Sequence, residues 1–131
     1  MRATFTFLLL LLLMVALLVG CAPLCGYLPF LDETFSVPPQ SLRTLTIDAK
    51  EGDLIEGIIT IKGGEKDLVF REEDPDGIEI YNSGTVYDRH DFQVDCPKEG
   101  TYTLQFDNSF SPVKKDVYIH YRARPISQEI P

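Results

Sequence analysis

Strict alternation of apolar and polar side chains in the run Gly100–Ser111 most constrains how this 131-residue chain can fold. Tyr102, Leu104 and Phe106 occupy every second position, and polar residues lie between them. Because successive side chains of an extended strand point to opposite faces, the run predicts a strand with one apolar and one polar face. Asn108 follows, and its type favours a turn because its side chain bonds nearby backbone groups.

The same alternation recurs along most of the chain. The segments that show it are Leu45–Ala49, Ile55–Ile61, Leu68–Phe70, Ile78–Ile80, Phe92–Cys96 and Val117–Tyr121. Turn signals rich in Gly, Pro and Asp separate them, at Lys62–Glu65, Asp74–Gly77 and Pro97–Gly100. Evenly spaced short strands of this kind are typical of sandwiches. We therefore predict an all-β chain, an antiparallel β-sandwich of about seven to eight short strands.

An apolar leader precedes this pattern. Arg2 is followed by an uncharged stretch with an apolar core at Phe5–Val19, and Leu18–Cys21 reads Leu-Val-Gly-Cys. This resembles the lipobox of bacterial lipoproteins, in which the preceding peptide is removed and the cysteine is acylated with fatty acids such as palmitate. The resemblance makes Cys21 the expected lipidation site. The stretch free of charge extends to Asp32, so a retained transmembrane anchor stays open as the alternative.

These features divide the chain into four parts. We expect a lipoprotein signal peptide at 1–20, the lipidated cysteine and a tether at 21–40, a β-sandwich domain at 41–124 and a flexible tail at 125–131. With either kind of anchor, the domain lies outside the cytoplasm. Its expected location is the cell membrane or the outer membrane.

Charge and cysteine content limit the partners of the mature chain. The net charge is −8, and it becomes −9 when the leader is removed, because the leader holds Arg2 and no acidic residue. A chain this acidic is unsuited to nucleic acid. Two further cysteines, Cys25 and Cys96, either form a disulfide or stay unpaired. We expect them to be unpaired, with Cys96 packing as a small apolar residue.

Catalytic and metal-binding signals are weak. His90 and His120 are the two histidines, and no serine or cysteine lies in a nucleophile motif. The acidic run Glu72–Asp76 has carboxylates that suit Ca²⁺, but its spacing differs from that of an EF-hand loop. We therefore expect no enzymatic activity, no cofactor and no bound metal.

The last predicted strand carries a better candidate site. Tyr118, His120 and Arg122 alternate with apolar residues and are expected to face outward. An amphipathic aromatic ring beside a guanidinium suits a protein partner or a sugar, and a merely solvated sheet face is the alternative. If the strand at 100–107 pairs with this strand, the same face also includes Thr101, Thr103 and Gln105.

A resemblance to a known family rests on the order of several short motifs. The family shows Gly-x-Tyr, an apolar residue, an aromatic residue, x-Asn and a nearby Ser before a last strand opened by lysine. The matching residues here are Gly100, Tyr102, Leu104, Phe106, Asn108, Ser111, Lys114, Lys115, Val117 and Tyr121. Upstream, Glu51–Asp53, Gly57, Gly63–Gly64 and Asp74–Gly77 add to the likeness. Residues 41–124 thereby resemble the GOLD (Golgi dynamics) domain.

That resemblance implies a compact β-sandwich that serves as a protein-interaction module without catalytic residues. Gln105 stands where the family's cargo adaptors usually have a disulfide cysteine, so their role in vesicle traffic is not carried over. We expect a membrane-tethered, non-catalytic binding module that recruits or stabilises another protein. A carbohydrate-binding accessory lipoprotein and a passive surface domain are the alternatives.

Overall fold

The structure is a computed structural model that describes residues 29–126, and it confirms the all-β prediction. The strands are β1 (Leu31–Val37), β2 (Leu42–Ala49), β3 (Asp53–Lys62), β4 (Asp67–Glu73), β5 (Glu79–Tyr87), β6 (Arg89–Asp95), β7 (Gly100–Asp107) and β8 (Lys115–Pro125). The expected signal peptide, Cys21, Cys25 and residues 127–131 lie outside the described residues. Residues 29–126 contain no helix long and apolar enough to cross a bilayer.

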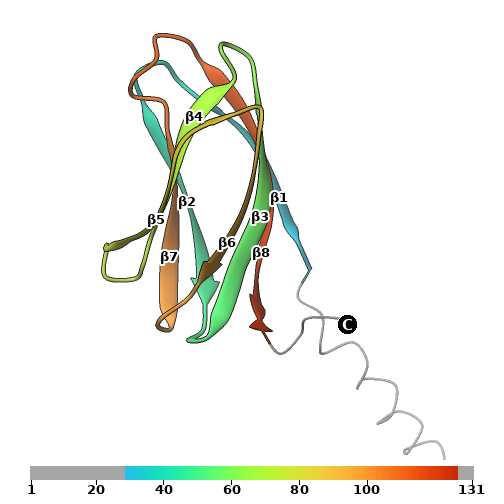
Figure 1. The fold of residues 1–131 in the computed structure, drawn as a ribbon, viewed down its shortest axis with the longest axis vertical. Helices are drawn as coiled ribbons and strands as arrows, with labels where there is room; N and C mark the ends of the chain where they lie inside the picture. Colours follow the sequence, from blue (N-terminus) through green and yellow to red (C-terminus); the bar gives the residue numbers. More distant parts are fainter. Residues whose placement is uncertain (1–28, 127–131) are drawn as a thin grey trace, which may run out of the picture.

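Two four-stranded antiparallel sheets form the sandwich (Figure 1). The first sheet has the order β1-β8-β3-β6, and the second has the order β2-β7-β4-β5. The described chain enters at β1 and leaves after β8 at one end of the sandwich, which we call the basal end. The β1–β2, β3–β4, β5–β6 and β7–β8 connections lie at the opposite, apical end.

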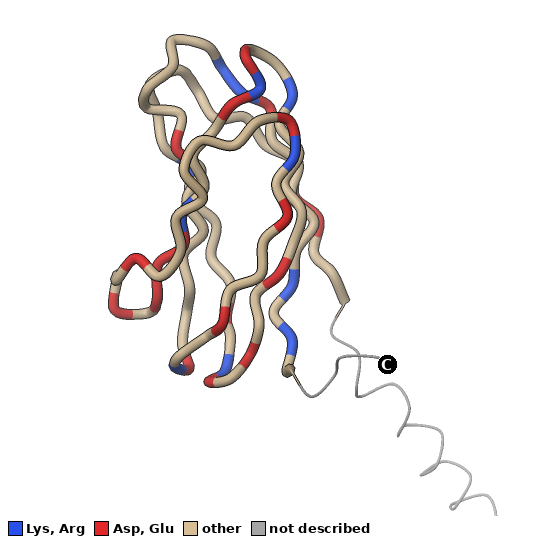
Figure 2. The backbone as a smooth tube through the Cα atoms, in the orientation of Figure 1, with Lys and Arg blue, Asp and Glu red and all other residues tan. Residues whose placement is uncertain are grey.

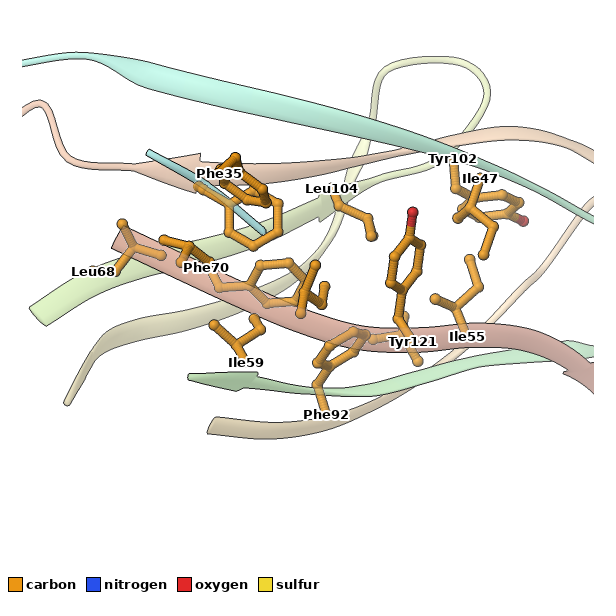
Figure 3. Packing of buried hydrophobic residues seen from close by; sticks show 14 of the residues in the cluster. Phe35, Ile47, Ile55, Ile59, Leu68, Phe70, Phe92, Tyr102, Leu104 and Tyr121 are labelled. Atoms are coloured by element: carbon orange, nitrogen blue, oxygen red, sulfur yellow. The ribbon is translucent and has the colours of Figure 1, made fainter. Parts of the chain in front are cut away.

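The core consists of the inward residues of both sheets (Figure 3). Tyr102, Leu104 and Phe106 are fully buried, as their alternation predicted. The Phe106 ring meets Phe35 edge to face, with ring centroids 4.9 Å apart. Phe70 packs against Phe106 at 5.4 Å. Each buried aromatic side chain contributes about 1.5–3 kcal/mol through removal of apolar surface from water, so this layer accounts for much of the stability.

Close packing of β3 against β8 depends on one glycine. A Cβ atom on Gly57 would lie 2.6 Å from the carbonyl oxygen of His120 and 2.8 Å from Cβ of Tyr121. Neither atom is the end of a flexible side chain. The absent side chain at Gly57 therefore lets the two strands pair while the Phe92 and Tyr121 rings stay in the core.

Two features differ from the sequence expectations. Residues Leu31–Val37, expected in the tether, form edge strand β1, because Phe35 and Val37 bury against the core. The last strand, β8, pairs with β1 and β3 rather than with β7, because the β7–β8 connection crosses between the sheets. Thr101, Thr103 and Gln105 therefore lie on the outer face of the second sheet, away from the face of β8.

The apical connections are tied together by buried polar side chains. The amide nitrogen of buried Asn108 lies 2.8 Å from the Val113 carbonyl oxygen and 3.1 Å from that of Pro38. Lys115 is fully buried, forms an ion pair with Asp67 and lies 3.1 Å from the Asp67 carbonyl oxygen. Asn108 thus joins the first and last apical connections, and Lys115 joins the starts of β8 and β4.

Candidate functional site

The outward face of β8 presents Tyr118, His120 and Arg122, a set that we call the β8 face. The alternate residues, Val117, Ile119 and Tyr121, are buried in the core, so the parity predicted from the sequence matches the structure. β8 lies between β1 and β3, and both neighbours contribute side chains to this face.

Asp32 on β1 organises one half of the β8 face. It lies opposite His120 in the strand register, and its Oδ1 atom is 2.6 Å from Nδ1 of His120. Tyr118 donates its hydroxyl hydrogen to the same oxygen at 2.6 Å. The hydrogen bond from Tyr118, followed by the one from His120, lowers the pKa of Asp32, and Asp32 in turn raises the pKa of Tyr118. One ionised carboxylate therefore fixes the orientation of both side chains.

Phe30 covers part of the same face. Its ring stacks on the His120 imidazole with centroids 4.2 Å apart and planes 11° apart. The guanidinium carbon of Arg122 lies 4.1 Å from the centre of the Phe30 ring, a cation–π contact. Phe30 and Tyr118 each keep 38% of their surface exposed. The face thus offers two aromatic rings that are held in place and still reach solvent.

Glu56 on β3 organises the other half. Its Oε1 atom accepts hydrogen bonds from Nε of Arg122 at 2.9 Å and from Nε of Arg124 at 2.7 Å. Burial raises the pKa of Glu56, but Arg124 and then Arg122 lower it by more, and the net effect is a lower pKa. Gln93 on β6 donates to the other carboxylate oxygen at 3.4 Å. Glu56 therefore stays ionised and holds Arg122 against the sheet.

A depression of about 590 Å³ lies beside the β8 face, over β3 and β6. Its lining includes Phe30, Glu56, Ile58, Asp91, Gln93 and His120. An aromatic ring, an aliphatic side chain and several hydrogen-bonding groups converge there. Such a lining can bind a ligand by apolar contact and fix its orientation by polar contacts.

Sequence reasoning missed three contributors to this site. Phe30 and Asp32 fall in the stretch that we assigned to a tether, and Glu56 was assigned only to a strand. The alternation of Phe35 with Val37 was the available signal that a strand begins here. With that strand recognised, Asp32 would have been placed on a sheet edge.

The acidic run at 72–76 does not converge on one point. The Glu72 side chain is fully buried, and neither of its carboxylate oxygens has a hydrogen-bond partner. Burial raises the pKa of Glu72 to about 8. Oδ1 of Asp74 instead accepts hydrogen bonds from the backbone N–H groups of Asp76 and Ile78, at 2.9 and 3.0 Å. Within residues 29–126, no three His, Cys, Asp or Glu side chains are grouped to hold a metal.

His90 and Cys96 also have potentially reactive side chains, and both pack against the domain. Nε2 of His90 lies 2.7 Å from the Tyr81 hydroxyl oxygen, and burial lowers the pKa of His90. Cys96 is a buried free thiol whose pKa burial raises to about 11. A protonated thiol is a poor nucleophile, so the Cys96 thiol is unreactive.

The residues of the family motif are structural. Tyr102 is buried, donates its hydroxyl hydrogen to the Lys98 carbonyl oxygen at 2.6 Å and accepts the Lys98 N–H at 3.2 Å. A family model for the emp24/gp25L/p24 family/GOLD matches residues 32–129. The chain belongs to this family. The GOLD match includes β1, whereas the domain expected from the sequence began at residue 41.

Comparison with individual proteins adds little to the family assignment. No curated protein sequence is significantly similar to this GOLD chain. Among solved structures, the periplasmic lysozyme inhibitor PliG of Aeromonas hydrophila, which inhibits g-type lysozyme, is similar at 16% identity. The match covers 72% of this chain and 87% of PliG, with a TM-score of 0.49.

Proposed function

We propose that this GOLD-family chain is a membrane-tethered, extracytoplasmic and non-catalytic module that binds another protein through the β8 face. The observation that carries the proposal is the arrangement of Phe30, Tyr118, His120 and Arg122 around two buried or paired carboxylates. Aromatic and arginine side chains are enriched at the energetic centres of protein interfaces. Here they are fixed before binding, so little side-chain entropy is lost on association.

Capture from membranes tests this proposal. Tagged full-length chain is recovered from detergent-solubilised membranes after brief cross-linking, and co-purifying proteins are quantified against an untagged control. The double variant Tyr118→Ala/His120→Ala is compared with Thr46→Ala/Thr103→Ala, a cross-strand pair on the second sheet. We expect a specific partner that the first variant loses at least tenfold and the second retains. Equal recovery by both variants would contradict the proposal.

The depression beside the β8 face favours a second candidate, a carbohydrate-binding accessory lipoprotein. Sugar sites combine an aromatic platform with planar hydrogen-bonding groups, and Phe30 lies there with Asp91 and Gln93. A glycan array that includes cell-wall polysaccharides distinguishes the two candidates. Selective binding that Phe30→Ala removes would favour the carbohydrate role. A chain that binds no glycan on the array and captures no protein from membranes would be a passive surface domain.

Membrane attachment through Cys21 is part of the same proposal. Two or more acyl chains anchor a protein stably, because each buried CH₂ contributes about 0.8 kcal/mol. Growth with radiolabelled palmitate should label the wild-type chain, and Cys21→Ser should abolish the label and release the chain from membranes. A labelled Cys21→Ser chain would assign the lipid elsewhere, and an unlabelled wild-type chain in the membrane fraction would favour the transmembrane alternative.

A further inference from the structure

Charge is unevenly distributed between the two ends of the sandwich. The apical end, defined as residues 38–41, 62–67, 87–89 and 108–116, carries five basic and four acidic residues. The remainder of residues 29–126 carries six basic and fifteen acidic residues. Figure 2 shows mixed blue and red at the apical end and mostly red on the projecting β4–β5 turn. An acidic partner is therefore repelled least at the apical end.

The apical end also exposes apolar side chains that lie close to one another. Phe110 is 49% exposed and Val113 is 41% exposed, both in the β7–β8 connection. The ammonium group of Lys115 lies 5.5 Å from the centre of the Phe110 ring. Gly64 has a φ of +55°, and a Cβ atom there would meet Val113 at 2.8 Å and Lys115 at 3.2 Å. Phe110 and Val113 therefore flank the Lys115 side chain, and we call these two residues the apical patch.

Hydrogen bonds made by two buried side chains, Asn108 and Ser111, hold the connection that carries the apical patch. Asn108 bonds the Val113 carbonyl oxygen, and Ser111 accepts the Val113 N–H through its hydroxyl oxygen at 3.2 Å. The buried Lys115–Asp67 pair fixes the next residues. Exposed apolar residues on a loop held by several buried hydrogen bonds lose little entropy when they bind.

We propose that the apical patch docks into an apolar cleft with an acidic rim on a second protein, separately from the β8 face. Lys62 and Lys114, exposed beside the patch, would face that rim. A lipid surface fits this end less well than a protein does. Attraction to anionic lipid is about 1 kcal/mol for each basic residue, and the apical end has only one more basic residue than acidic residues. A second copy fits less well too. Apical-to-basal contacts between copies do not close into a symmetric dimer, and apical-to-apical contact would bring Lys62 and Lys114 of one copy against the same lysines of the other.

Photo-cross-linking in intact cells tests this proposal with the full-length chain. A photo-reactive phenylalanine analogue replaces Phe110 in one strain and Ile78 in the control strain. Ile78 is also an exposed apolar residue, at 59%, but it lies on the acidic β4–β5 turn. We expect one discrete adduct with another protein from position 110 and none from position 78. The adduct partner is then purified and titrated with the wild-type chain, Phe110→Ser/Val113→Ser and Lys62→Glu/Lys114→Glu.

Each outcome decides the proposal. The proposal is supported if both double variants bind the purified partner at least tenfold more weakly than the wild-type chain does. Wild-type binding should also weaken at higher salt, and Ile78→Ser should bind the partner as the wild-type chain does. Far-ultraviolet circular dichroism of each variant shows whether it is folded. An adduct of twice the chain mass, equal adducts from both positions or no adduct would overturn it. Binding to vesicles of phosphatidylethanolamine and phosphatidylglycerol that Cys21→Ser retains and Cys21→Ser/Phe110→Ser/Val113→Ser loses would also overturn it. Loss of partner binding by Tyr118→Ala alone would leave the β8 face as the binding surface and overturn the apical one.

Discussion

The carboxylate of Asp32 and the imidazole of His120 face each other across the β1–β8 pair, with Oδ1 2.6 Å from Nδ1. An ionised carboxylate only accepts hydrogen bonds, so Nδ1 of His120 must carry the proton. The edge strand thereby sets the tautomer of a residue in the proposed binding face and leaves Nε2 as the ring nitrogen available to a partner.

Replacement of Asp32 should release this tautomer. In Asp32→Asn the charged acceptor is lost, and neutral His120 should redistribute toward the Nε2-protonated form. Nitrogen-15 shifts of the imidazole at pH 8 report the change. Asp91→Asn is the matched control, because Asp91 lies on the same outer sheet face but bonds Arg89. A His120 that keeps its tautomer in Asp32→Asn would show that the carboxylate does not set it.

The buried Glu72 predicts an unusual dependence of stability on pH. The folded chain keeps Glu72 protonated to about pH 8, whereas the unfolded chain ionises near the ordinary value of 4.5. The contribution of Glu72 is therefore complete below pH 4.5 and is lost as the pH rises toward 8. The limiting slope is about 1.4 kcal/mol of unfolding free energy for each pH unit.

Urea unfolding between pH 5.5 and 8 measures this slope. Glu72→Gln removes the ionisable group at nearly constant size, so its stability should fall less steeply than that of the wild-type chain. Both proteins keep both histidines, so the difference isolates Glu72. Parallel profiles for the two proteins would show that Glu72 titrates normally.

Asn108 should contribute more to stability than any other polar residue of its connection. Asn108→Ala leaves the part-buried carbonyl oxygens of Val113 and Pro38 and the buried carbonyl oxygen of Val37 without their donor, at a cost of about 2–3 kcal/mol. Chemical denaturation measures the change. Ser109→Ala, at the exposed neighbouring position, should cost less than about 0.5 kcal/mol. Similar losses in the two variants would mean that Asn108 does not tie the apical connections together.

The buried Lys115–Asp67 pair should show strong coupling. Removal of one partner, as in Lys115→Met, leaves a buried carboxylate uncompensated and should cost about 3–5 kcal/mol. The double variant Lys115→Met/Asp67→Leu removes both charges and should recover most of that loss. A double-mutant cycle by urea unfolding supplies the coupling energy. Additive losses would indicate that the two side chains act independently.

Sequence patterns predicted the inward and outward faces but not the neighbours. Alternation assigned Phe106 to the core and Tyr118 to the surface, because the period of two belongs to one strand alone. It did not show that β8 pairs with β1 and β3, because pairing depends on how the β7–β8 connection crosses between sheets. Phe30 and Asp32 were missed for that reason: their role arises from the register with β8.

Glu72 shows a second limit. It lies in an acidic run that the sequence analysis considered only as a possible calcium site, yet its position on β4 points it inward between the sheets. A charge run indicates solvent exposure only on average, and the parity of Leu68 and Phe70 was the better guide. The family motif, in contrast, identified the domain because residues such as Tyr102 and Asn108 perform local structural tasks.

Hydroxyl-radical footprinting of the full-length chain tests most directly whether the β8 face is the binding surface. The oxidation rates of individual side chains are measured by mass spectrometry with and without the partner recovered by membrane capture. Phe30 and Tyr118 are both 38% exposed, and each should be oxidised at least fivefold more slowly in the complex, while Ile78 stays unchanged. Unchanged oxidation of Phe30 and Tyr118 in a saturated complex would contradict the account.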